Sequence, residues 1–188
     1  MNILESLKDK LLVADGAFGT CYVGMYGEQG TVAPELANMR HPERVLEIHK
    51  EYVKAGAGLI RTNTFAANTA SLDADTDYVI SNVRAAVKLA KQAADGEAGT
   101  DHKKVYIAGD IGPIPADAGL TLNERVSQYK LLGEAMQDMG VDIVSLANNH
   151  ILDYGQEALS DTFTTLDEAG IRYVGAGESL ERAKEAQI

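Results

Sequence analysis

Short apolar runs alternate with longer amphipathic segments along the whole chain. The apolar runs have the length and composition of buried strands. They cover residues 10–15, 58–64, 103–110, 141–147 and 171–177. The amphipathic segments place hydrophobic residues three or four positions apart, as on one face of a helix. They cover residues 41–56, 75–95, 121–140, 154–170 and 179–187. The pattern therefore predicts about five strand–helix units in series.

Local signals support several of the predicted helices. Pro42 stands near the start of one helix and Gly56 at its end, which are the usual positions of these residues. Thr121 and Glu124 have the spacing of a capping box. The hydrophobic stripe of the second long helix consists of Val79, Val83, Val87 and Ala90. Three other stretches are predicted as an amphipathic helical turn, a Gly-rich loop and a surface loop, at residues 1–10, 16–40 and 95–104 respectively.

Strands and helices that alternate in this way are typical of a parallel α/β sheet with right-handed crossovers. Residues 1–188 are predicted to form a single α/β domain. Two architectures fit the pattern, a partial (β/α)8 barrel and an open, doubly wound sheet. A partial barrel leaves two sheet edges and its interior uncovered, so we expect a homodimer in that case.

Polar residues follow the predicted strands at their carboxyl ends. Ligands of parallel α/β folds gather at this end of the sheet. The residues concerned are Asp15, Thr62, Asn63, Thr64, Asp110, Asn148, Asn149 and His150, with the glycines of 175–177. Such residues also cap helices and form turns, which is the alternative for each of them taken singly. Their convergence at one edge predicts a binding site there.

Composition narrows the classes of partner. The net charge of −11 argues against nucleic acid or an anionic membrane as a partner. The sequence has no run of about 18 apolar residues, so no transmembrane helix is expected. The single cysteine, Cys21, excludes an internal disulfide and a zinc site built from several cysteines. These features predict a cytoplasmic protein.

Three stretches carry a family resemblance: LLVADGAFGT at 11–20, PELANMRHPERVLEIHKEYVKAGAGLIRTNTFAAN at 34–68 and VYIAGDIGP at 105–113. Over about residues 8–140, the chain resembles the amino-terminal half of homocysteine S-methyltransferases. It is most similar to the type found in bacterial enzymes that also carry a folate reductase domain. The resemblance implies a (β/α)8 barrel and methyl transfer to homocysteine.

The same resemblance implies roles for two groups of residues. Asp15 would accept the amino group of homocysteine, while Gly16 and Ala17 would let the backbone approach the substrate. The pocket lining at the second predicted strand would come from Thr62, Asn63 and Thr64. We also expect Asp15 and Asn63 to lie within side-chain reach of each other, because they end neighbouring strands.

This chain differs from the family in the residues that bind the family's metal. Homocysteine S-methyltransferases bind zinc through cysteines on later strands, including a Gly-Gly-Cys-Cys motif near the carboxyl end. Zinc converts the substrate thiol into the nucleophilic thiolate. This chain has Cys21 alone, and about five predicted strands where a barrel has eight. We therefore expect no methyl transfer from this chain, although its status as an enzyme stays open.

Residues from about 140 to 177 resemble a different family. The segment SLANNHILDYG, at 145–155, is similar to bacterial poly-γ-glutamate and capsule biosynthesis proteins, which are related to metallophosphatases. This resemblance implies that Asn149 and His150 belong to a metal or phosphate site that takes a divalent metal. The alternative for His150 is a histidine that is hydrogen-bonded at a strand end.

The two resemblances divide the domain into a methyltransferase-like half-barrel, 1–140, and a capsule-biosynthesis-like segment, 141–188. Three origins fit: an engineered chimera of two α/β fragments, which we favour, a natural recombinant, and a truncated, divergent methyltransferase. Three functions also fit. The chain is a homocysteine-binding methyltransferase-like domain, a metal-dependent phosphoesterase-like fragment, or a folded scaffold without activity.

Overall fold

Parallel strand pairing organises the structure, a computed structural model that describes residues 11, 13–27, 33–97, 104–115, 117–140, 143–146, 151–152, 155–168 and 172–184. The strands in this part of the chain are β1 (Leu59–Arg61), β2 (Tyr106–Ala108), β3 (Ile143–Ser145) and β4 (Arg172–Val174). Leu59 of β1 pairs with Tyr106 of β2, and Ile143 of β3 pairs with Arg172 of β4. Ala14 forms a further parallel bridge with Leu59. Each of the predicted apolar runs thus contributes to parallel pairing.

The strands form two ladders, β1–β2 and β3–β4. Within the described residues, β2 and β3 are neighbours in space but no ladder of hydrogen bonds joins them. Each strand is three residues long and therefore offers few hydrogen bonds to a neighbour. The parallel α/β class predicted from the sequence is confirmed, and the described strands are divided between two small sheets.

Helices connect the strands and follow the last of them. They are α2 (Phe18–Tyr26), the 3-10 helix η1 (Pro34–Leu36), α3 (Ala37–Arg40), α4 (Pro42–Lys54), α5 (Thr69–Leu72), α6 (Thr76–Glu97), α7 (Leu122–Asp138), α8 (Gly155–Glu168) and α9 (Leu180–Lys184). The long helices agree with the predicted ones to within a few residues. Thr121 and Glu124 make both hydrogen bonds of the predicted capping box at the start of α7. The predicted stripe of α6 is buried throughout.

The loop predicted for residues 16–40 is wrong, because α2, η1 and α3 lie within it. Gly19 and Gly24 weaken the helical pattern of α2, since glycine is a poor helix former. Tertiary contacts compensate: Tyr22 of α2 is 3% exposed and packs against α4. Helix α6 also runs to Glu97, two residues beyond the predicted helix end at 95 and into the loop predicted for 95–104. The helical turn predicted for residues 1–10 lies outside the described residues.

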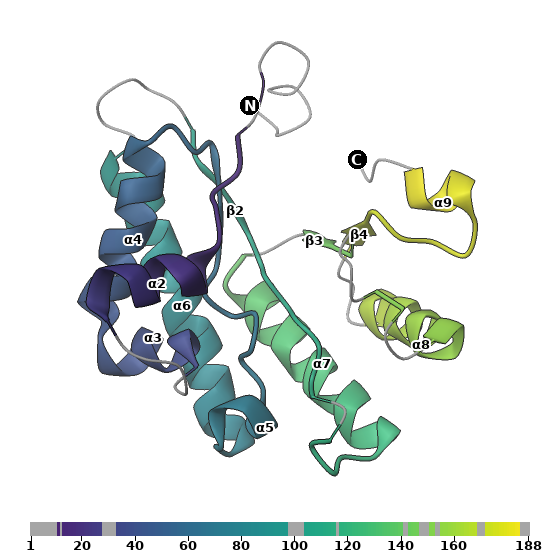
Figure 1. Cartoon of the computed structure of the whole chain (residues 1–188). Helices are drawn as coiled ribbons and strands as arrows, with labels where there is room; N and C mark the ends of the chain where they lie inside the picture. The colour runs from purple at the N-terminus through teal and green to yellow at the C-terminus, as the bar shows by residue number, and fades with distance from the viewer. Residues whose placement is uncertain are drawn as a thin grey trace.

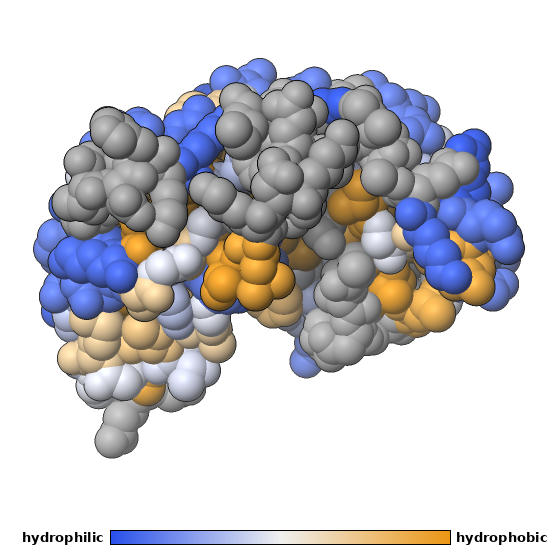
Figure 2. All heavy atoms as spheres, turned by 90° about the horizontal axis from the view of Figure 1, so that it is seen from above, coloured by the Kyte–Doolittle hydropathy of each residue, from blue (hydrophilic) through white to orange (hydrophobic). Residues whose placement is uncertain are grey.

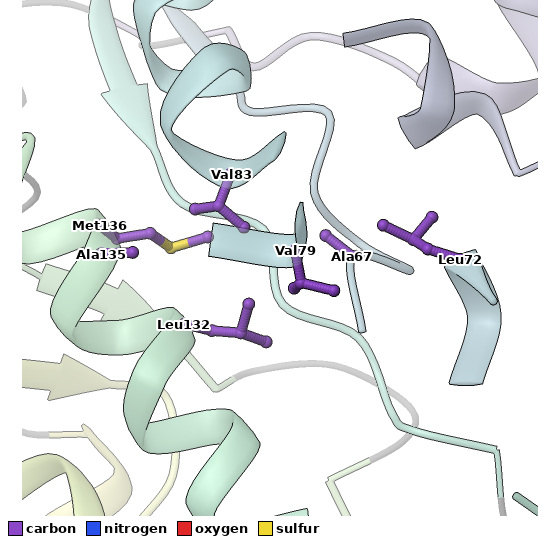
Figure 3. Close-up of a cluster of buried hydrophobic side chains, with 7 residues drawn as sticks. All are labelled: Ala67, Leu72, Val79, Val83, Leu132, Ala135 and Met136. Atoms are coloured by element: carbon purple, nitrogen blue, oxygen red, sulfur yellow. The ribbon is translucent and has the colours of Figure 1, made fainter. Parts of the chain in front are cut away.

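Helix α6 is at the centre of the core. Figure 3 shows Val79 and Val83 of this helix facing Leu132 and Met136 of α7. Further along α6, Ala90, Ala93 and Ala94 pack against Ile60 of β1. Alanine lets the helix approach the strand closely, while each fully buried valine, leucine or methionine contributes about 1.5–3 kcal/mol.

The helices are distributed unevenly around the strands. In Figure 1, α2, α3, α4 and α6 lie on one side of β2, while β3, β4, α8 and α9 lie on the other. The segment after β1 contacts the first group of helices, because Asn38 of α3 donates a hydrogen bond to the carbonyl oxygen of Asn63. The segment after β2 contacts α7, because the backbone N–H of Ile114 donates to the hydroxyl of Tyr129.

His49 on α4 is a fully buried histidine. Its ring lies 5.1 Å from the ring of Phe18 on α2, measured between centroids. The residue is 0% exposed, and neither ring nitrogen has a hydrogen-bond partner among the described residues. Burial disfavours the charged imidazolium and lowers the pKa of His49 to about 4. The folded protein therefore keeps His49 neutral at pH values where the unfolded chain protonates it.

We predict that acidification from pH 6.5 towards pH 4 lowers the free energy of unfolding through His49. Between these values the unfolded state binds more protons than the folded state, so the contribution is complete above pH 6.5 and is lost as the pH falls. The loss is roughly 3 kcal/mol. Urea unfolding at about pH 7.5 and about pH 4.5 should show that His49→Leu loses less stability on acidification than the wild type does. His41→Gln, at a half-exposed histidine, should behave as the wild type. Equal losses in His49→Leu and the wild type would contradict the prediction.

Candidate functional site

The candidate site lies where three parallel segments end at one edge. Asp15 follows the bridge between Ala14 and Leu59, residues 62–64 follow β1, and Asp110 follows β2 by two residues. Because Ala14 and β2 both pair with β1 in parallel, their carboxyl ends share an edge. Ligands of parallel α/β folds bind at this kind of edge.

Asp15 is held by Arg61, at the end of β1. The Asp15 side chain is 1% exposed, and both of its oxygens accept hydrogen bonds from Arg61. Oδ2 accepts from the backbone N–H at 2.8 Å and Oδ1 accepts from Nε at 3.0 Å. Arg61 Nη2 also donates to the carbonyl oxygen of Gly16 at 2.8 Å. The carboxylate of Asp15 thus fixes the arginine, and the arginine fixes the loop that begins at Gly16.

The loop at Gly16 and Ala17 lies against Tyr52 of α4. The Tyr52 hydroxyl donates a hydrogen bond to the carbonyl oxygen of Ala17 at 3.3 Å. A Cβ atom on Gly16 would lie 3.0 Å from the same hydroxyl oxygen. Glycine at position 16 therefore lets the backbone lie directly on the tyrosine ring. Gly16 and Ala17 are both exposed.

Thr62 and Thr64 join the end of β1 to the end of β2 through their hydroxyl groups. The two hydroxyl oxygens are 2.7 Å apart, and both residues are buried. Thr64 donates to the carbonyl oxygen of Asp110 at 2.5 Å, while the backbone N–H of Asp110 donates to the Thr62 hydroxyl at 3.1 Å. Both threonines therefore fix the backbone of Asp110.

The Asp110 carboxylate stays partly open to solvent. Its side chain is 27% exposed, and Oδ2 lies 3.6 Å from Nη1 of Arg61. Burial raises the pKa of Asp110 above its ordinary value, Arg61 opposes the increase, and the negative charges of Asp15 and Glu35 add to it. Asp110 therefore carries a carboxylate whose charge is only partly balanced by its surroundings.

Asn63 points its amide toward η1 and α3. Its Nδ2 donates to the carbonyl oxygen of Pro34 and to Oδ1 of Asn38, each at 3.0 Å. Asn38 Nδ2 donates in turn to the carbonyl oxygen of Asn63 at 2.7 Å and to Oδ1 of Asn82 at 2.8 Å. The structure thus brings Asp15 together with Arg61, and Asn63 together with Asn38. Pocket-lining roles for residues 62–64 stay predictions.

Glu35, at the second position of η1, is a buried acid beside the same turn. The residue is 5% exposed, and its Oε1 accepts a hydrogen bond from the backbone N–H of Ala66 at 2.9 Å. Its Oε2 has no hydrogen-bond partner among the described residues. The backbone carbonyl of Glu35 accepts from Asn82 Nδ2 at 2.8 Å. Asn82 therefore ties the backbone of Glu35 to α6.

Sequence reasoning missed Arg61, Glu35, Asn38 and Asn82. Arg61 stands inside an apolar run, Glu35 and Asn38 lie in the stretch predicted as a loop, and Asn82 lies within a regular helical pattern. Charged and amide side chains interrupt those patterns, and a buried polar residue needs a partner. Such an interruption is the feature of the sequence from which these residues could have been recognised as parts of the site.

The predicted metal ligands, Asn149 and His150, lie outside the described residues, so their role stays a prediction. The described ranges contain no group of three or more His, Cys, Asp or Glu residues that could hold a metal ion. Cys21 lies on α2, where its Sγ donates a weak hydrogen bond to Sδ of Met25 at 3.7 Å. The described residues therefore do not fit the cysteine-bound zinc that the methyltransferase resemblance implies.

The helices in the described ranges are too short or too polar to cross a bilayer. None of them combines the length and the apolar composition that a membrane span requires.

Two protein families match overlapping parts of the chain. The homocysteine S-methyltransferase family matches residues 12–153, and the bacterial capsule synthesis protein family PGA_cap matches residues 124–188. Both resemblances seen in the sequence are thereby confirmed. Residue 140, the predicted boundary between them, lies within the overlap.

Methionine synthases are among the similar proteins. The one from Mycobacterium leprae is 33% identical over 121 residues, which are 60% of this chain and 10% of that protein. The one from Mycobacterium tuberculosis is 31% identical over 121 residues, with the same coverage. The chain therefore spans about a tenth of the length of these relatives.

Crystal structures of the homocysteine methyltransferase MmuM from Escherichia coli have a similar fold. The apo form has a TM-score of 0.68 at 22% identity, over 92% of this chain and 62% of that chain. The metallated form has a TM-score of 0.69 at 21% identity, over 92% and 65% of the two chains. The segments that end at Asp15, residues 62–64 and Asp110 all lie within the match of the first family, which covers most of the chain. The chain therefore belongs to the homocysteine S-methyltransferase family.

Proposed function

We propose that this chain binds homocysteine at the carboxyl ends of β1 and β2. The observation that carries the proposal is the contact of Asp15, Arg61 and Asp110 at this edge, within the part matched by the family. The relatives named methionine synthase and homocysteine methyltransferase supply the substrate class. The exposed loop at Gly16 and Ala17 would contact the substrate through its backbone.

Methyl transfer needs more than this binding site. A free thiol has a pKa near 8.5, so only a small part of bound homocysteine is thiolate at neutral pH. The family lowers this pKa with zinc held by cysteines, and these 188 residues contain Cys21 alone. We propose that the chain by itself holds homocysteine without activating it.

We also propose that the chain forms part of a (β/α)8 barrel. The support is the similarity in fold, which covers 92% of this chain and 62% of the E. coli apo structure. At the start of the first pairing, Leu11 is 90% exposed and Val13 is 52% exposed. Figure 2 shows hydrophobic side chains at the surface of the face seen from above. Exposed apolar residues at a strand edge favour burial against further strands, which a longer protein or a second copy of this chain would supply.

A second candidate function concerns the carboxyl-terminal part. The PGA_cap family matches residues 124–188, which include Asn149 and His150. An amide oxygen and an imidazole are both suitable ligands for a divalent metal. We propose that this part binds a divalent metal independently of the homocysteine site.

We predict that homocysteine raises the melting temperature of the chain and that Gly16→Ala abolishes the increase. A ligand that binds only the folded state stabilises it by about 2.7 kcal/mol at a hundred times its dissociation constant. The added Cβ at position 16 would lie 3.0 Å from the Tyr52 hydroxyl oxygen, so the loop and the tyrosine would have to move apart where the substrate is proposed to bind.

Gly24→Ala is the matched control for this measurement. No heavy atom lies within 4 Å of a Cβ at position 24, so the control should keep the increase. It should also gain about 0.5–1 kcal/mol of stability, because alanine replaces glycine within a helix. A wild-type melting temperature that homocysteine leaves unchanged would favour an inactive scaffold.

We predict no methyl transfer to homocysteine with S-methylmethionine or methyl-folate as the donor, with or without added zinc. The physical reason is the missing set of cysteine ligands, which leaves the substrate thiol mostly protonated. The rate of product formation, measured over hours, should be the same with and without the protein. Zinc-dependent turnover well above that background would overturn this prediction and show that other residues hold the metal.

We predict that manganese raises the melting temperature through the carboxyl-terminal part. The double variant Asn149→Ala, His150→Ala should lose this increase and keep the increase caused by homocysteine. Asn148→Ala, next to the two proposed ligands, serves as the control and should respond to manganese as the wild type does. Loss of both responses in the double variant would mean that the substitutions unfold the chain, which circular dichroism would detect. An unchanged manganese response would rule out Asn149 and His150 as ligands.

A further inference from the structure

Arg61 holds the Asp15 carboxylate through two donors that differ in how easily a ligand can replace them. The backbone N–H of Arg61, within β1, donates to Oδ2 at 2.8 Å. The side-chain Nε donates to Oδ1 at 3.0 Å, and the Arg61 side chain is 41% exposed. A backbone donor in a strand stays in place, whereas an exposed side chain changes rotamer readily. Oδ1 of Asp15 is therefore the oxygen that can exchange its partner.

Asp110 offers the same guanidinium a second carboxylate. Its Oδ2 lies 3.6 Å from Arg61 Nη1, beyond normal hydrogen-bond distance, and its side chain is 27% exposed. The hydroxyl groups of Thr62 and Thr64 fix the backbone of Asp110. Burial raises the pKa of Asp110, and the nearby Arg61 opposes the increase. A small movement of the guanidinium from Asp15 to Asp110 would therefore exchange one ion pair for another.

The charges at this edge balance when a second cation is present. Asp15 and Asp110 carry two negative charges when both are ionised, and Arg61 contacts both with one positive charge. A carboxylate removed from water is costly without a partner of opposite sign. Homocysteine, the ligand of the proposed function, carries a positive charge in its ammonium group, which has three donors.

We propose that Arg61 is a specificity-determining residue, which occupies Asp15 Oδ1 until a ligand's ammonium group replaces it and which then pairs with Asp110. This inference rests on the proposed function and adds how the site selects its ligand. A ligand without a cationic group does not replace the guanidinium, because the buried Asp15 would keep a charge without a partner. The site thus accepts thiol-bearing amino acids and rejects thiol-bearing carboxylic acids.

The same movement releases the loop that begins at Gly16. Arg61 Nη2 donates to the carbonyl oxygen of Gly16 at 2.8 Å, and this bond breaks when the guanidinium moves to Asp110. The Tyr52 hydroxyl still donates to the carbonyl oxygen of Ala17 at 3.3 Å, so the loop stays attached to α4. Replacement of Arg61 and contact between the loop and the ligand are therefore coupled.

The competing arrangement leaves Arg61 in place and gives it the carboxylate of the ligand. Asp15 and Asp110 already lie beside the guanidinium, so a third carboxylate would raise the excess of negative charges from one to two. Like charges at such short distances repel one another. This arrangement also predicts weaker binding when Arg61 is replaced, whereas the proposal predicts tighter binding.

Isothermal titration of Arg61→Gln with L-homocysteine tests the proposal. Glutamine removes the competing cation and keeps the backbone donor to Asp15. The variant should bind homocysteine about tenfold to a hundredfold more tightly than the wild type, since the ammonium group no longer displaces a charge-assisted hydrogen bond. Its melting temperature without ligand should fall, because the buried Asp15 loses its cation. Arg84→Gln, at an exposed arginine that pairs with Asp138, is the matched control and should bind as the wild type does.

A second ligand, 4-mercaptobutanoate, measures the selectivity, because it is homocysteine without the amino group. Wild type should bind it at least about tenfold more weakly than homocysteine. Arg61→Gln should not bind it more tightly than the wild type does. Tighter binding of both ligands by the variant would show that Arg61 merely obstructs the site, and would refute selection by charge.

A double-mutant cycle with Asp110→Asn tests where the guanidinium goes. In the wild-type background this substitution should weaken homocysteine binding about tenfold, because the displaced guanidinium loses its second carboxylate. In the Arg61→Gln background it should change the affinity by about threefold or less, because there is no guanidinium to receive. Equal effects in the two backgrounds would show that Asp110 acts on the ligand directly, and would refute the exchange.

Failure of this inference and failure of the proposed function give different results. If wild type binds homocysteine and Arg61→Gln binds it equally well or more weakly, the role of Arg61 is refuted and the proposed function stands. If neither protein binds homocysteine, both fail. Should circular dichroism show that Arg61→Gln does not fold, Arg61→Lys replaces it. Lysine lacks the fork that bonds Asp15 and Gly16 together, so this variant should bind homocysteine about threefold or more tighter than the wild type. Equal or weaker binding by Arg61→Lys would refute the inference.

Discussion

The carboxylate of Asp15 accepts two hydrogen bonds from Arg61, one from the backbone and one from the side chain. This pair joins the first extended segment to β1, and the remaining guanidinium nitrogens reach the Gly16 carbonyl and the Asp110 carboxylate. A single side chain thus connects all three segments whose ends form the candidate site. Because Asp15 is almost fully buried, removing Arg61 would leave a desolvated charge without a partner, at a cost of several kcal/mol.

A second set of polar contacts holds the opposite side of the same edge. Asn38, Asn63 and Asn82 bind one another and the backbone of η1, so each buried amide has a partner. Buried amides that are fully hydrogen-bonded fix one arrangement of the chain more strictly than apolar contacts do. The turn after β1 is therefore determined from both directions: by Arg61 near the solvent and by the asparagines within the core. Asn63 serves this inner framework, and Asp110 is the residue whose carboxylate stays available.

Sequence patterns predicted the regular part of the fold well and the candidate site only in outline. The stripe of Val79, Val83 and Val87 and the capping box at Thr121 depend on local periodicity, which a sequence displays directly. Helix α2 depends on burial of Tyr22 against α4, which involves residues far apart in the chain. The hydrogen bonds between Arg61 and the Asp15 carboxylate also join residues far apart in the chain, and for this reason the sequence did not predict them. A charged residue in an apolar run signals a buried partner but does not identify it.

Helix α7 has a position that bears on how such a chain can be assembled. Its buried face, with Leu132 and Met136, covers α6, and the helix also contacts α8. Most of this helix lies in the overlap of the two family matches. A sequence exchanged just beyond α7 keeps the cover of α6 intact, whereas an exchange before it removes that cover. The end of α7 is therefore a position at which two sequences can be joined. A strand and a helix from another protein family can follow α7, and the contacts between α6 and α7 that support the strand ends are kept.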